Sequence, residues 1–100
     1  MIQENRRHDR QSVSLAGTLK SEDDADYARA CRIEDMSVGG ARIALIGADT
    51  RMPERPLLEI STFGSYAVEV AWSKPPRFGL KFRDAPEAMA EMLAAIAMHG

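Results

Sequence analysis

Apolar and polar residues alternate along several short stretches of the chain, each bounded by polar, glycine or proline residues. A period of two residues is typical of a strand with one buried face. The alternation recurs in six segments: residues 12–20, 28–36, 41–45, 57–61, 66–72 and 78–82. In the clearest of them, the even-numbered residues from Tyr66 to Trp72 are expected to share one face. Six short strands are therefore predicted before residue 83.

The pattern changes after Phe82. Residues 86–98 are rich in alanine, methionine, leucine and glutamate, which favour a helix. An apolar stripe follows at helical spacing: Met89, Met92, Leu93 and Ile96. Asp84 is placed to cap the helix, and Pro86 suits its first turn. We expect an all-β fold, a six-stranded antiparallel barrel, closed or split, whose C-terminal helix covers one opening or face.

Composition narrows the possible functions. The chain has 100 residues, 45% of them hydrophobic, which suits one small globular domain. Its net charge of −2 argues against a DNA or RNA polymer as partner, because such binding depends on a basic excess. No apolar run is long enough to enter a membrane, the N-terminus shows no secretory signal, and a single cysteine excludes an internal disulfide. A cytoplasmic location is expected.

Two polar clusters stand apart from the strand pattern. Arg6 and Arg10 have three residues between them, and Asp35, Ser37 and Gly40 follow at the turn between two predicted strands. In order and spacing, R-x-x-x-R followed by [DN]-x-S-x-x-G resembles the two-part signature of the PilZ domain family. Either motif alone is a weak indication, but the two together are fairly specific.

The resemblance extends over nearly the whole chain, since residues 68–82 are also similar to the family's later strands. It implies a PilZ-type barrel over residues 11–100, with a C-terminal helix at about 86–98. Residues 1–10 would form a flexible arm that carries the R-x-x-x-R motif. It also implies a cyclic di-GMP receptor, in which the ligand orders the arm over the barrel and exposes a surface to a downstream protein partner.

The residue types suit such a ligand. Arg6 and Arg10 offer planar forks of donors that match phosphate oxygens and the guanine O6 and N7 atoms. Asp35 is an acceptor for the Watson–Crick edge of guanine, and Ser37 can donate or accept at close range. Gly40 leaves the backbone approachable, or permits a turn with positive φ. Two neighbours of these positions, Arg7 and Gly39, are further candidate contacts, although Arg7 is equally well explained as a solvated residue.

Other function classes receive less support. A PilZ-type module that only docks on proteins would not require the two arginines together with Asp35, Ser37 and Gly40. Catalysis is not expected, because Ser37 lacks the surroundings of a nucleophile elbow and the chain has no phosphate-binding loop. Neither a metal nor a cofactor is expected, since the two histidines are not at ligand spacing. The sequence leaves open the pathway, the oligomeric state and the number of ligand molecules per site.

Overall fold

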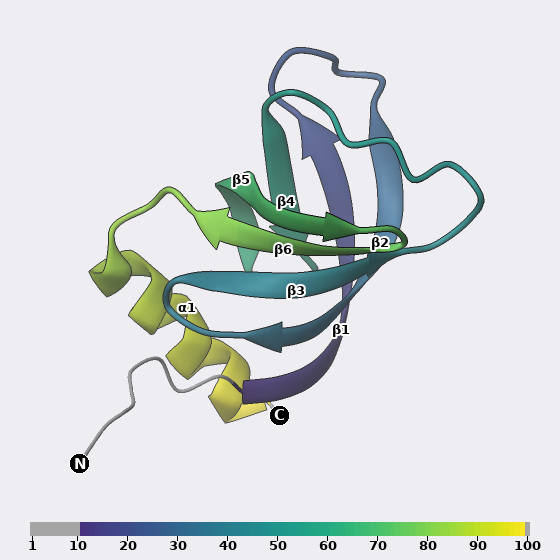
Figure 1. Ribbon diagram of the computed structural model, residues 1–100. Coiled ribbons are helices and arrows are strands. Elements are labelled where there is room, and N and C mark those ends of the chain that lie inside the picture. Colours follow the sequence, from purple (N-terminus) through teal and green to yellow (C-terminus); the bar gives the residue numbers. More distant parts are fainter. Residues whose placement is uncertain (1–10, 100) are drawn as a thin grey trace.

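The computed structural model describes residues 11–99 and contains six strands followed by one helix (Figure 1). The elements are β1 (Gln11–Ser21), β2 (Ala28–Met36), β3 (Gly40–Leu45), β4 (Pro56–Ile60), β5 (Gly64–Lys74), β6 (Arg77–Phe82) and α1 (Pro86–His99). The predicted number, order and type of the elements are confirmed. Four strands extend beyond their predicted bounds by one or two residues, β2 matches them, and β4 begins and ends one residue earlier than predicted. Differences of this size are ordinary for element boundaries.

The strands form a closed barrel in the order β1-β2-β3-β6-β5-β4, and every neighbouring pair is antiparallel. Hairpin connections join β1 to β2, β2 to β3, β4 to β5 and β5 to β6. Two long-range pairings, β3 with β6 and β1 with β4, complete the ring. The predicted antiparallel barrel is therefore confirmed, in its closed form.

The core lies inside the barrel and is formed by side chains that point inward from alternate positions of the strands. Its fully buried aliphatic side chains are Leu19, Ile33, Ile43, Leu58 and Ile60. Burial of each such side chain stabilises the fold by roughly 1.5–3 kcal/mol. Cys31 belongs to the same core, and burial raises the pKa of its thiol to about 11, so the thiol stays protonated and acts as a small apolar group.

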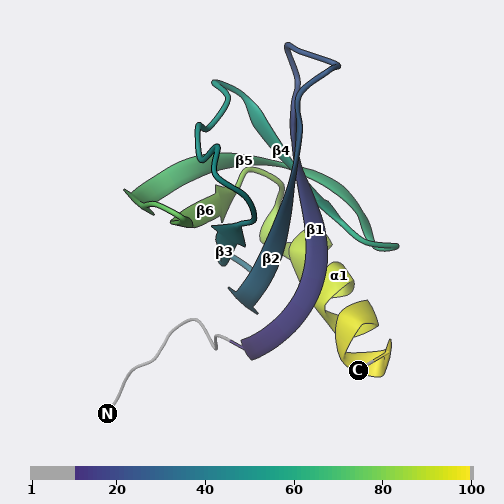
Figure 2. The ribbon, with the colours of Figure 1, turned by 90° about the vertical axis from the view of Figure 1, so that its right-hand side faces the viewer.

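Helix α1 completes the core. Three residues of its predicted stripe, Met89, Met92 and Ile96, are buried among the barrel side chains. Figures 1 and 2 show α1 beside the first half of β1. The residue before the helix is Ala85, whose carbonyl accepts hydrogen bonds from the first turn, so the expected cap at Asp84 is not used. Among residues 11–99, no helix is long and apolar enough to cross a membrane.

Two irregularities in strand pairing change which side chains face outward. Between β2 and β3 the register shifts after Ile33, and between β5 and β6 it shifts after Val70. A bulge inserts one unpaired residue, so the alternation of faces is reset beyond it. Trp72 consequently pairs with Gly79 and lies on the outer surface, with 42% of its area exposed. The expectation that Trp72 shares the inward face of Val68 is wrong for this reason.

Candidate functional site

The turn between β2 and β3 is built by the serine of the second motif. The Ser37 amide donates to the Gly40 carbonyl at 2.8 Å, and the Ser37 hydroxyl accepts from the Gly39 amide at 3.2 Å. Ser37 is only 2% exposed. A serine hydroxyl that accepts from a backbone amide two residues later is a common turn motif. Ser37 therefore fixes the shape of the turn, whatever else it contacts.

The two glycines of this turn have different surroundings. The glycines with a left-handed φ in residues 11–99 are Gly47 and Gly64, so neither Gly39 nor Gly40 serves a positive-φ turn. A Cβ atom on Gly40 would overlap the carbonyl oxygen of Leu80, because the backbones of β3 and β6 run close together there. Of the two reasons expected for a glycine at position 40, a close approach to its backbone is the one that applies. The group that approaches is the backbone of β6.

A hollow of about 360 Å³ opens beside this turn. Its lining residues come from three parts of the chain: Ser37, Gly39, Gly40, Ala41, Ala71, Trp72, Gly79, Leu80 and Lys81. Small residues form much of the wall, Trp72 supplies one aromatic ring, and Lys81 supplies one positive charge. A concave, largely apolar wall with a few polar groups is typical of small-molecule sites.

The contributions of β5 and β6 were missed by the sequence reasoning. The sequence predicts only that Trp72 shares a face with Val68, and it singles out no residue of β6 as a ligand contact. The sequence does contain an indication of this wall: Trp72 stands between two small residues, and a glycine, Gly79, follows seven positions later. This indication can be interpreted only when the bulge after Val70 is known, because the bulge places the indole of Trp72 over Gly79.

Gly79 determines where the Trp72 ring lies. A Cβ atom built on Gly79 would collide with three atoms of the indole, including Nε1. We therefore expect Gly79→Ala to displace the ring from the barrel and to shift the fluorescence maximum of the protein to longer wavelength. Trp72 is the single tryptophan, so the emission reports this one ring. An unchanged spectrum in a folded Gly79→Ala variant would contradict the assignment.

Asp35 does not line the hollow but lies next to it on the outer surface of β2. Its cross-strand partner is Arg42, whose Nε is 3.4 Å from Asp35 Oδ2. The preceding residue, Glu34, receives two hydrogen bonds from Arg77, at 3.0 and 3.1 Å. The hydrogen bond from Arg77 lowers the pKa of Glu34, against the opposing effect of burial. Two adjacent carboxylates thus stand beside the hollow, each with an arginine partner.

The arginines of the first motif, Arg6 and Arg10, lie outside the described residues, as does Arg7. Gln11, the first described residue, pairs with Met36, the residue directly before Ser37. In Figure 2 the start of β1 lies beside the end of β2. Strand β1 therefore begins next to the second motif.

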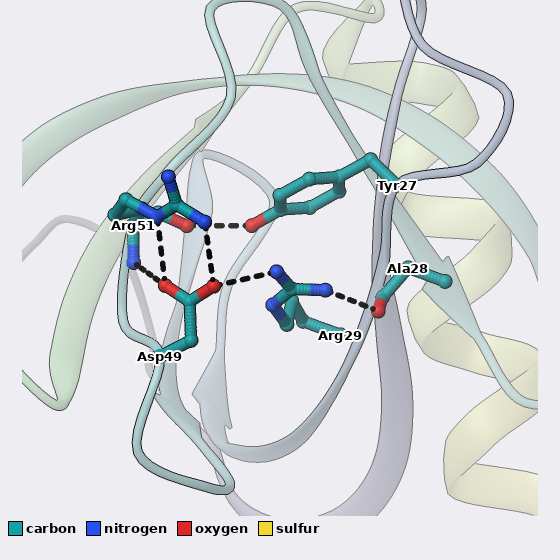
Figure 3. A network of polar contacts seen from close by, with 5 residues as sticks. All are labelled: Tyr27, Ala28, Arg29, Asp49 and Arg51. Carbon is teal, nitrogen blue, oxygen red and sulfur yellow. Dashed lines mark hydrogen bonds and ion pairs between the residues drawn. The ribbon is translucent and has the colours of Figure 1, made fainter.

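A second polar cluster lies at the other end of β2 (Figure 3). Asp49 accepts two hydrogen bonds from the Arg51 side chain, both 3.0 Å, and one from Arg29 at 2.6 Å. These bonds, with those from Arg51 foremost, hold the pKa of Asp49 well below its usual range. The Tyr27 hydroxyl donates to the Arg51 carbonyl at 2.6 Å. The cluster joins the loops that follow β1 and β3. Seven residues of β2, roughly 25 Å of strand, separate its Arg29 from Ser37 of the motif turn.

Comparison with known families shows to which family the chain belongs. The family model described as "PilZ domain" matches residues 4–98. The chain belongs to the PilZ domain family. PilZ domains are receptors for cyclic di-GMP and are binding modules without catalytic activity, so the absence of a catalytic constellation predicted from the sequence agrees with the family. The sequence is not significantly similar to any curated protein.

Solved PilZ structures share the fold. The PilZ domain with c-di-GMP of YcgR from Escherichia coli matches at a TM-score of 0.66 and 16% identity, over 95% of this chain and 91% of that chain. The PilZ domain of CeSA from a cellulose-synthesizing bacterium matches at 0.62 and 11% identity, over 92% and 99%. YcgR in complex with c-di-GMP matches at 0.61 and 18% identity, over 95% of this chain but 46% of the longer one. At these identities the likeness concerns the fold alone.

Proposed function

We propose that this PilZ domain binds cyclic di-GMP in the hollow beside the β2–β3 turn. One observation carries the proposal: the motif turn and the exposed ring of Trp72 line the same hollow, and Gln11, the residue after Arg10, pairs with Met36 beside that turn. The hollow, at about 360 Å³, falls at the lower end of the range for small-molecule sites. Its openness to solvent suits a ligand that a further segment of the chain would cover.

The barrel offers contacts for a guanine base. The exposed indole of Trp72 is a stacking surface, and stacking on an aromatic ring contributes about 1–3 kcal/mol per base. Asp35, beside the hollow, accepts from the N1–H and N2–H₂ groups that distinguish guanine from adenine. Gly39 and Gly40 keep side chains away from the turn, while Ser37 acts mainly by holding it in shape.

The phosphates require positive charge, which would come largely from the N-terminal arm, residues 1–10. Arg6 and Arg10 would each form a charge-assisted pair with a phosphate or a guanine edge, and Arg7 is a further candidate. Lys81, from the wall of the hollow, adds one charge on the barrel side. Ordering the arm costs conformational entropy, so part of the contact energy is consumed in fixing it. The ordered arm and ligand together would present a new surface to a downstream protein partner.

Calorimetric titration of the purified protein with cyclic di-GMP tests the proposal. We expect saturable binding that weakens as salt rises, because the ligand carries two negative charges. Cyclic di-AMP and GTP are the controls, and neither should bind comparably. A hundredfold excess of ligand over its Kd should stabilise the fold by about 2.7 kcal/mol, measurable by thermal unfolding.

The alternative is a PilZ domain that docks on proteins without binding nucleotide. Failure of cyclic di-GMP to bind at millimolar concentration would reject the receptor and support this alternative. The same titration also gives the number of ligand molecules per site.

A further inference from the structure

The bulge in β2 places two acidic side chains side by side. In regular alternation Glu34 and Asp35 would face opposite sides of the sheet. The register shift after Ile33 leaves Glu34 without a cross-strand partner, and both carboxylates face outward. Their side chains are only 17% and 14% exposed.

One arginine bridges this pair. The Nε atom of Arg42 lies 3.2 Å from Glu34 Oε1 and 3.4 Å from Asp35 Oδ2. Within residues 11–99, Arg77 contacts Glu34 through Nε and Nη2 and does not contact Asp35. Among these contacts, Arg42 is therefore the one that links Asp35 to Glu34. With both arginines present, the formal charges of the four side chains sum to zero.

We propose that Arg42 is a positioning residue for guanine recognition, which acts by holding the Asp35 carboxylate. The proposal rests on the proposed function of Asp35 as the acceptor for the guanine edge. A carboxylate oxygen has two lone pairs, so Oδ2 can accept from Arg42 and from a base at the same time. The arginine does not compete with the ligand; it restricts the rotation of the acceptor that the ligand uses.

Arg42 also acts through charge. Without it, the surroundings of Asp35 and Glu34 lose one positive charge and become more negative by one unit, beside a doubly negative ligand. Loss of Arg42 thus weakens binding in two ways: it removes one restraint on the Asp35 carboxylate, and it makes the surroundings of the phosphates more negative. These effects are separable. Removing the charge of Glu34 relieves the repulsion of the phosphates but does not restore the restraint on Asp35.

Titration of variants with two ligands tests the proposal. Arg42→Met should weaken cyclic di-GMP binding by about tenfold, the loss of one charge-assisted contact. Its preference over cyclic di-IMP, which lacks the N2 amino group, should shrink as well. Adding Glu34→Gln to Arg42→Met should restore part of the affinity and none of the preference. Arg42→Lys, which keeps the charge without the planar fork, should be intermediate and serves if Arg42→Met does not fold.

Arg83→Met is the matched control, because Arg83 is exposed, carries the same charge and makes no ion pair with residues 11–99. It should bind both ligands as the unaltered protein does. Unchanged affinity and preference in Arg42→Met would overturn the inference alone. Equal weakening for both ligands, with no recovery from Glu34→Gln, would also overturn it, as a merely structural role. If the unaltered protein binds no cyclic di-GMP, the proposed function fails first, and this inference fails with it.

Discussion

Gly40→Ala is expected to lower the free energy of unfolding by about 1–3 kcal/mol, the typical range for overpacking a closely packed site. The added methyl group would overlap the carbonyl oxygen of Leu80, which belongs to the backbone and cannot rotate away. Relief requires β3 and β6 to separate, and this pairing is one of the two that close the barrel. Denaturant unfolding with an unchanged m-value would measure the effect.

The neighbouring glycine provides the control. A Cβ atom on Gly39 would find its nearest neighbour, Ser37 Oγ, at 3.8 Å, an ordinary contact. Gly39→Ala should therefore change stability by less than about 0.5 kcal/mol, as for an open surface position. If the two variants were equally stable, the close approach of β6 would not be the reason for glycine at position 40.

Arg10→Ala is expected to weaken cyclic di-GMP binding by about 10- to 100-fold. Hydrogen bonds to charged groups contribute roughly 1.5–3 kcal/mol, and a bidentate arginine makes two of them. The thermal stability of the free protein should not change, because the core is built from residues between Leu19 and Ile96. Calorimetric titration and thermal unfolding of the same preparation separate the two effects.

Arg83→Ala removes an equal charge away from the arm and should leave the affinity within about twofold. An Arg10→Ala variant that binds as tightly as the Arg83→Ala control would reject the role of the arm. Loss of stability in free Arg10→Ala would instead show that the residue supports the barrel.

The alternation of apolar residues was sufficient to predict the fold. Residues such as Ile33, Ile43 and Leu80 face inward as their period of two requires, and the stripe from Met89 to Ile96 packs as a helix face should. These features depend on local sequence, and for that reason they could be predicted. The motif residues Ser37 and Gly40 were also found at the expected turn.

The parts of the site that escaped prediction all depend on pairing between distant strands. Whether Trp72 faces in or out is decided by one unpaired residue opposite β6, and the alternation YAVEVAW gives no sign of it. Glu34 and Asp35 reach one face through a similar shift against β3. The need for glycine at position 40 comes from Leu80, forty residues later.

The same long-range pairing determines when the hollow can appear during folding. The turn that carries Ser37 belongs to a hairpin, which forms from neighbouring residues, but the opposite wall arrives with β6, at Gly79 to Lys81. Contacts of such separation form late, because the loop between them must first be closed. Ligand present during folding would thus bind only chains whose barrel has already closed. It should slow unfolding and leave the refolding rate unchanged.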